Sequence, residues 1–257
     1  MENKKERTTR SQYQTKVSED FPQTLTFGDS RFVKKLSMRY GENPGYPAAF
    51  YQEEGANGPN MATMGLSYIN VADMDLGQRL ARKLDIIFPG KSIAVIIKHE
   101  MPSAVALGDN TPEAFQKAWQ ADALSNFGSV DVFNTEVGPE LARWLVESVR
   151  NIEVVYAPSY TPEALDILSS RKVLRVVRMG AQLTEAAVDN GLEFKRVAGG
   201  LLVQKRFDSR IVSPEFIDVV SVKKPTDTQL KAALLCWTVA CFTRSNAIVI
   251  GTEDKIH

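Results

Sequence analysis

The apolar positions of the chain follow two different periods, and each period predicts a different element. Leu76, Leu80 and Leu84 lie one helical turn apart and predict a helix over Met74–Ile87. Ile93–Ile97 is an unbroken apolar run of strand length, which is typical of a strand whose sheet is covered on both faces. This part of the chain is therefore expected to be a helix followed by a buried strand.

The same alternation continues to the end of the chain. Thr111-Pro112-Glu113-Ala114 and Thr161-Pro162-Glu163-Ala164 each read as a helix start, with a hydroxyl N-cap, a proline and an acid in the first turn. The apolar face from Leu141 to Val149 predicts another helix, and Thr226–Phe242 predicts a last one with Thr226 and Gln229 at capping-box spacing. Further strands are expected at Ile152–Ala157, Val173–Val177, Leu201–Gln204, Ile217–Val222 and Asn246–Ile250. Alternating strands and helices indicate an α/β protein with helices on both sides of its sheet.

Two segments lack such periodicity. Residues 1–30 are polar and mixed in charge, so we expect a flexible polar N-terminal tail. Arg39–Asn60 is rich in glycine, proline and asparagine, which predicts mostly loop and turn. We therefore divide the chain into the tail and a single α/β domain over residues 31–257.

Composition narrows the class of partner. Lys and Arg number 31 and Asp and Glu number 31, so no net charge attracts nucleic acid or an anionic membrane. Cys236 and Cys241 form neither a disulfide framework nor a metal-ligand pair. The N-terminus has no apolar segment typical of a secretory signal, and no apolar run is long enough to span a bilayer. We expect a soluble cytoplasmic protein without a bound metal.

Lys98 and His99 are the strongest candidates for chemistry. They close the buried strand, and ligands of open α/β sheets gather beyond the carboxyl ends of strands. An imidazole can exchange a proton near neutral pH, and an adjacent ammonium can stabilise a developing oxyanion. Two surface residues at a strand exit would give the same pattern, so position alone leaves both interpretations open.

Three other segments carry weaker signals. Arg39, in a loop rich in glycine and proline, suits a phosphate or carboxylate, although a turn with a solvated arginine is the more ordinary interpretation. Phe127 beside Gly128 could stack on a flat heterocycle or could simply belong to the core. Asn246 could orient a polar ligand or could cap a turn.

Seven segments taken in order resemble the transformylase domain of the bifunctional purine enzyme, 5-aminoimidazole-4-carboxamide ribonucleotide (AICAR) transformylase/IMP cyclohydrolase. The most specific is RYGENP, which begins at Arg39, and the set extends from there to Ile250. The segments are RYGENPGYPAAFY, LSYINVADMD, VIIKHEMPSAVALG, DALSNFGSV, IEVVYAPSYTPEALDIL, AGGLLVQKR and VKKPTDTQL with RSNAIV.

The resemblance implies a cytidine-deaminase-like fold, a layered α/β/α arrangement with a mixed central sheet. It also implies transfer of a formyl group from 10-formyltetrahydrofolate to the 5-amino group of AICAR, in a homodimer whose active site lies at or near the interface. Lys98, His99 and Asn246 match the family's catalytic residues. The matches to its substrate-binding residues are Arg39, Tyr40, Asn70, Phe127, Gly128 and Glu153.

These residue types suit that reaction. The AICAR amine is conjugated with a carboxamide-bearing imidazole and is a poor nucleophile, so it needs a base, for which His99 is the candidate. The formyl oxygen gains charge in a tetrahedral intermediate, which Lys98 and Asn246 could stabilise. Arg39 would hold the 5′-phosphate, and Phe127 would pack against the flat base.

The match also has gaps. No cyclohydrolase segment precedes RYGENP, and the glycine-rich segment and second subdomain that follow SNAIV in the family do not appear. After His99, the chain has Ser103 and Ala104 in place of Cys and Gly, and Asn126 stands in place of Ala. Two hypotheses follow: a compact formyltransferase whose site is completed across a homodimer, and a non-catalytic nucleotide-binding or partner subunit. The formyl donor is either the folate or formate with ATP.

Overall fold

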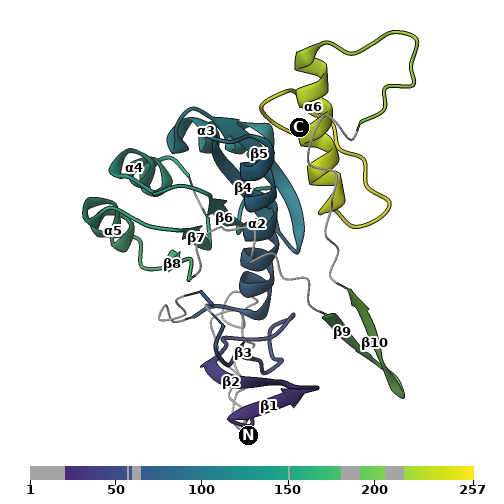
Figure 1. Ribbon diagram of the computed structural model, residues 1–257. Coiled ribbons are helices and arrows are strands. Elements are labelled where there is room, and N and C mark those ends of the chain that lie inside the picture. Colours follow the sequence, from purple (N-terminus) through teal and green to yellow (C-terminus); the bar gives the residue numbers. More distant parts are fainter. Residues whose placement is uncertain (1–20, 57, 60–64, 150, 181–191, 206–216) are drawn as a thin grey trace, which may run out of the picture.

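The computed structural model describes residues 21–56, 58–59, 65–149, 151–180, 192–205 and 217–257. Its main body is a five-stranded sheet with helices on both faces (Figure 1). The sheet has the strand order β5-β4-β6-β7-β8. A smaller three-stranded sheet and a two-stranded hairpin lie beside this body.

The central sheet is mixed. Its strands are β5 (Met101–Gly108), β4 (Ser92–Lys98), β6 (Val130–Phe133), β7 (Val154–Ala157) and β8 (Arg175–Arg178). Strand β4 runs antiparallel to both of its neighbours, whereas β6, β7 and β8 are parallel to one another. The prediction of a layered α/β/α fold with a mixed central sheet is confirmed.

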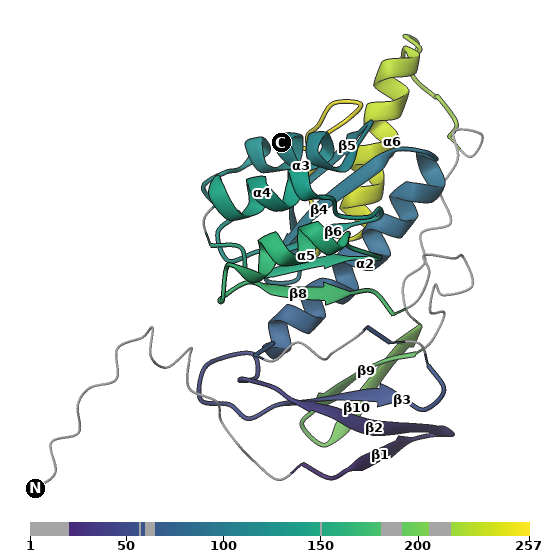
Figure 2. The ribbon, with the colours of Figure 1, turned by 90° about the vertical axis from the view of Figure 1, so that its left-hand side faces the viewer.

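Within the described residues, five helices cover the two faces of the sheet. On one side lie α3 (Thr111–Ala121), α4 (Pro139–Glu147) and α5 (Pro162–Ser169), which face the viewer in Figure 2. On the other side lie α2 (Tyr68–Ile87) and α6 (Asp227–Cys241), which contact each other. The helices on both sides exclude water from both faces of the sheet.

Strand β4 shows how the sequence specifies these layers. Ala94 and Ile96 belong to the core shared with α3, α4 and α5, whereas Ile93, Val95 and Ile97 belong to the core under α2 and α6. All five side chains are fully buried. Alternate residues of a strand point to opposite faces, so a strand between two helical layers favours apolar residues on both faces.

The remaining strands form two separate sheets. An antiparallel sheet joins β1 (Thr24–Phe27), β2 (Ser30–Ser37) and β3 (Ala49–Glu53), and a hairpin joins β9 (Leu192–Val197) to β10 (Gly200–Lys205). The predicted tail lies outside the described residues up to position 20, and its last part forms β1 and the turn into β2. The predicted loop over Arg39–Asn60 contains β3. Both strands are short and none of their residues is fully buried, so they leave no apolar period in the sequence.

Two predicted strands are wrong. Ile217–Val222 and Asn246–Ile250 have no ladder partners among the described residues, and several of their apolar side chains are exposed. A different segment pairs with the sheet instead: the Leu107 N–H donates to the Asp254 carbonyl at 2.7 Å, and the Ile256 N–H donates to the Val105 carbonyl at 3.0 Å. The chain near its C-terminus therefore covers the outer edge of β5.

Two predicted helix starts are confirmed, and two differ from the prediction. Thr161 caps α5, and Thr226 and Gln229 form the expected capping box of α6. Helix α3 is capped by Asn110 and not by Thr111, since its side-chain oxygen accepts from the backbone one turn later. Helix α2 begins at Tyr68, earlier than predicted, because Ser67 forms a capping box there.

Candidate active site

A tight turn presents His99 at the end of β4. Lys98 pairs with Met101 across the β4–β5 ladder, so only His99 and Glu100 lie between the two strands. Both have positive φ, 53° and 57°, which is the conformation of a two-residue type I′ hairpin. The chain therefore turns directly from β4 into β5. Pro102 fits there since β5 is at the edge of the sheet.

A buried carboxylate lies beneath this turn. Asp73 of α2 is 3% exposed, and its Oδ1 accepts a hydrogen bond of 2.6 Å from the Glu100 N–H. The His99 N–H also lies close enough to lower the pKa of this carboxylate. Burial raises the pKa of Asp73 to about 7, although the two amides act in the opposite direction. The Asp73 side chain therefore holds the backbone of the turn against α2.

Lys98 is held by the loop that precedes β6. Its Nζ donates to the Ser125 carbonyl at 3.0 Å and lies 3.7 Å from the centroid of the Phe127 ring. This is a cation–π geometry, and the ring remains 58% exposed. Gly128 has φ 76° and donates its N–H to the Asn151 carbonyl, which turns the chain into β6. The structure thus places Lys98 and Phe127, two of the residues expected at the site, in contact with each other.

Two of the departures from the family motifs contact each other behind this loop. The Ser103 hydroxyl donates to the Asn126 side-chain oxygen at 2.8 Å, and Asn126 is fully buried. Ser103 is the extra residue of β5 at the bulge, since Ile96 pairs with Ala104 and Ile97 pairs with Pro102. Ala104 is buried and does not have positive φ, so the alanine fits its place in β5 without backbone strain. The two polar replacements compensate each other and keep the loop packed on β5.

The segment that carries Asn246 is tied to the same turn. Arg244 reaches Glu100 with its Nη2 2.8 Å from Oε2. Asn246 is exposed, and its side-chain oxygen accepts from the Ser245 hydroxyl at 2.9 Å. The ion pair therefore brings the third predicted catalytic residue to the side of the turn that presents His99.

A second group of predicted residues converges on one carboxylate. Glu153 Oε2 accepts from Asn70 Nδ2 at 3.0 Å and pairs with Arg39 Nη2 at 3.5 Å. The Arg39 guanidinium also donates to the Tyr40 hydroxyl at 3.1 Å and lies 4.7 Å from the centre of that ring. Four residues that match the family's substrate-binding positions thus form one cluster: Arg39, Tyr40, Asn70 and Glu153. We call these four residues and Arg175, described next, the Glu153 cluster.

Arg175 is the member of this cluster that the sequence did not indicate. Its Nη1 lies 3.7 Å from Glu153 Oε2, and its side chain is 15% exposed. Burial and the neighbouring Arg39 guanidinium lower the pKa of Arg175. Two guanidinium groups beside one carboxylate leave a local excess of positive charge, which suits an anionic ligand. Arg175 is one of several arginines between residues 171 and 178, and nothing in the sequence distinguishes it.

Both groups lie at one end of the sheet. Because β4 is antiparallel to β6, the end of β4 at Lys98 is beside the beginning of β6, β7 and β8. The expectation of a site beyond carboxyl strand ends therefore holds for β4 alone, and Glu153 and Arg175 precede or begin their strands. Asp73, one turn after Asn70 on α2, links the turn at His99 to the Glu153 cluster.

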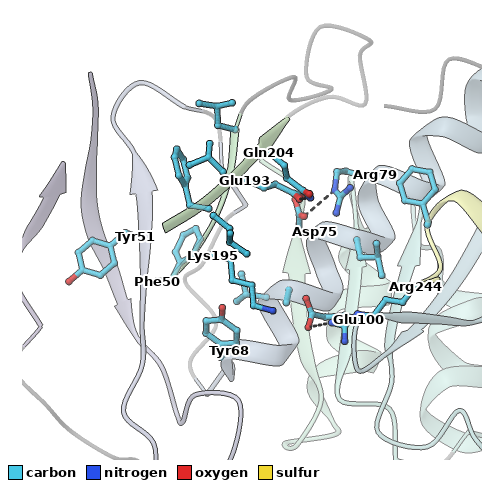
Figure 3. A pocket seen from close by; sticks show the side chains of 18 of the residues that line it. Phe50, Tyr51, Tyr68, Asp75, Arg79, Glu100, Glu193, Lys195, Gln204 and Arg244 are labelled. Atoms are coloured by element: carbon cyan, nitrogen blue, oxygen red, sulfur yellow. Dashed lines mark hydrogen bonds and ion pairs between the residues drawn. The ribbon is translucent and has the colours of Figure 1, made fainter. Parts of the chain in front are cut away.

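A groove of about 1210 Å³ opens next to the turn (Figure 3). Its walls come from the β2–β3 sheet, the β9–β10 hairpin, α2 and the end of α6. Glu100 and Arg244 form part of its lining, and the ion pair between Asp75 and Arg79 lies deeper along α2. Tyr68 adds an aromatic surface that is half exposed. The groove therefore reaches the turn at Glu100, whereas His99 and the Glu153 cluster are not among the residues that line it.

The part of the chain that the structure describes contains no group of three or more His, Cys, Asp or Glu that could hold a metal ion. Cys236 and Cys241 are both on α6, half-buried and free. Within the same residues, no helix has the length and apolar character needed to cross a membrane.

Comparisons with known proteins identify the family. A model of the family described as AICARFT/IMPCHase bienzyme matches residues 5–257. Among solved structures, dCMP deaminase from the cyanophage S-TIM5 in apo form is 19% identical, with 42% of this chain and 94% of that chain covered and a TM-score of 0.31. The same enzyme in complex with dCMP and dUMP is 17% identical, with 43% and 96% covered and a TM-score of 0.32. At these scores the deaminases support no statement about function.

Proposed function

The chain belongs to the AICARFT/IMPCHase bienzyme family, and we propose that it transfers a formyl group to the 5-amino group of AICAR during purine biosynthesis. The proposal is carried by the turn after β4, where an exposed imidazole follows an ammonium that is fixed by the Ser125 carbonyl and the Phe127 ring. The formyl donor in this proposal is 10-formyltetrahydrofolate.

We assign the proton transfers to His99. Its imidazole would take the proton from the AICAR amine as that nitrogen attacks the formyl carbon, and would return a proton to the leaving nitrogen of the donor. Lys98 and Asn246 would donate hydrogen bonds to the oxygen that becomes negative in the tetrahedral intermediate. The Arg244–Glu100 ion pair supports this assignment because it holds the Asn246 segment beside the turn.

Nucleotide binding is assigned to the other predicted residues. Arg39 and Tyr40 would hold the phosphate, with Arg175 as an additional cation and with Asn70 and Glu153 fixing the guanidinium groups. Phe127, beside Gly128, offers an exposed ring on which the flat base can stack. His99 and Asn246 are exposed in the single chain, so we propose that a second copy closes the site in a homodimer.

An absorbance assay tests the reaction directly. The expected result is AICAR-dependent conversion of 10-formyltetrahydrofolate to tetrahydrofolate, abolished in His99→Ala and retained in His257→Ala, which removes the other histidine of the chain. Formate with ATP is run in parallel as an alternative donor. Calorimetry then separates the two classes of function: AICAR binding without turnover from either donor would make the chain a non-catalytic nucleotide-binding or partner subunit.

The homodimer is tested separately by sedimentation at several protein concentrations. A dimer that forms in the micromolar range and gains stability when AICAR is added supports a site shared between copies. Full activity in a strict monomer would contradict the shared site and leave the assignment of His99 unchanged.

A further inference from the structure

The turn that presents His99 has an unfavourable backbone conformation. His99 and Glu100 both have left-handed φ values, and Asn151 is the only other non-glycine residue with positive φ in the described part of the chain. This region costs an L-residue roughly 1–2 kcal/mol relative to the right-handed conformation. The usual sequence for a type I′ turn is Asn-Gly, and this turn has neither residue. Some other interaction must therefore maintain it.

Asp73 provides that interaction from outside the hairpin. Its carboxylate accepts from the Glu100 N–H at 2.6 Å, and the His99 N–H also lies close enough to lower its pKa. It is 3% exposed and comes from α2, a different element from the one that it holds. Burying a carboxylate costs free energy unless its oxygens accept hydrogen bonds. The turn supplies such a donor, so the buried carboxylate and the turn stabilise each other.

We propose that Asp73 is a positioning residue for the formyl transfer, holding the backbone of His99 and Glu100 in the conformation that aims the imidazole at the substrate. This inference rests on the proposed function. Lys98 is fixed separately, through Ser125 and Phe127. Loss of Asp73 therefore displaces the imidazole while the ammonium and the Glu153 cluster keep their places.

Because the imidazole is displaced while the binding residues stay in place, kcat and KM should respond differently to loss of Asp73. Asp73→Asn preserves the shape of the side chain but removes its charge and leaves one acceptor oxygen instead of two, with an NH2 group in place of the second oxygen beside the N–H groups of the turn. We expect kcat to fall about 10- to 100-fold, as for a misplaced catalytic group, with the KM for AICAR within about threefold of the wild-type value. A residue that merely supports the fold would lower the thermal midpoint and the fraction of active protein without this separation of kcat from KM.

A second substitution tests the backbone part of the proposal. In the Asp73→Asn background, Glu100→Gly should restore much of kcat because glycine adopts positive φ at little cost. Glu100→Gln is the matched control: it also removes the ion pair with Arg244 but keeps a residue that disfavours positive φ. Equal effects of Gly and Gln, or an unchanged kcat in Asp73→Asn, would overturn the proposal.

A readout without turnover separates this inference from the proposed function. Amide hydrogen exchange at His99 and Glu100 should be slow in the wild-type protein and at least tenfold faster in Asp73→Asn, measured by NMR. Exchange at Val95 in the middle of β4 serves as the internal control for folding. If the wild-type protein shows no formyl transfer but the exchange result holds, only the proposed function fails. If transfer is observed and exchange does not change, only the role of Asp73 fails.

Discussion

Asp131, in the middle of β6, is a carboxyl group in the apolar core, and its removal is predicted to stabilise the protein above neutral pH. The side chain is fully buried; Oδ1 accepts from the Ser129 hydroxyl at 2.7 Å, and Oδ2 has no hydrogen-bond partner. Burial raises the pKa of Asp131 to about 7, and the single hydrogen bond opposes this only partly. The perturbation is Asp131→Asn, which keeps the shape and removes the ionisation.

The magnitude follows from proton linkage. The folded protein binds the Asp131 proton more tightly than the unfolded chain, where the pKa is near 3.8. Its contribution to stability is therefore fully present below about pH 4 and is lost as the pH rises through about 7. A difference of about three pKa units corresponds to about 4 kcal/mol. Asparagine does not ionise, so it does not lose this stability as the pH rises. The variant should therefore be about 2–4 kcal/mol more stable than the wild-type protein at pH 8 and no more stable at pH 4.

Urea unfolding followed by circular dichroism at pH 4, 6 and 8 measures this. At pH 8 the midpoint of Asp131→Asn should lie roughly 1 M higher than the wild-type midpoint. Asp166→Asn, an exposed position on α5, removes the same charge from the surface and should show no such gain. Asp73 keeps its own pH dependence in both proteins, so the variant is expected to retain part of the slope. Parallel curves for wild type and Asp131→Asn would refute the reasoning, because they would mean that water solvates this carboxylate in the folded protein.

Three further substitutions test packing, capping and charge. Gly77→Ala should destabilise the protein by about 1–3 kcal/mol in urea unfolding, because the added Cβ would lie 2.5 Å from Val132 Cγ2. This loss should exceed the gain from the higher helix propensity of alanine. A neutral effect would mean that α2 can move away from β6. Thr226→Ala should lose about 1 kcal/mol through the α6 cap, whereas Thr226→Ser should lose little, and equal losses would argue against capping. Arg175→Gln should raise the KM for AICAR about tenfold with kcat nearly unchanged, and Arg143→Gln, at an exposed ion pair, should not; equal KM values would remove Arg175 from the site.

The sequence identified the fold class because strands covered on both faces leave a strong apolar signal. Strand β4 is apolar throughout, and periodicity therefore found it. The exposed strands β1, β3 and β9 bury little, so their patterns do not differ from those of loops. Ile217–Val222 shows the converse failure, because β-branched residues raise the propensity for a strand but cannot supply a neighbouring strand to pair with.

The site shows a similar division. Motif order named Lys98 and Arg39, and the structure gave both of them specific partners. Arg175 and Asp73 were not indicated, since what makes them relevant is a contact with a residue far away in sequence. Asp73 in particular lies within a helical pattern where an acidic side chain ordinarily faces water. Only the packing of α2 against the β4–β5 turn shows that it faces inward.

The pairing along the outer edge of β5 affects the order in which the protein can fold. The N–H of Ile256 closes on the carbonyl of Val105, a residue 151 positions earlier in the chain, and Lys117 reaches Asp254 at 2.8 Å across the same region. During synthesis β5 and β4 can pair as a local hairpin long before residues 254–256 leave the ribosome. Throughout that interval one side of β5 offers unpaired backbone groups on which another nascent chain could add a strand. Residues 254–256 thus determine how long this edge stays unpaired.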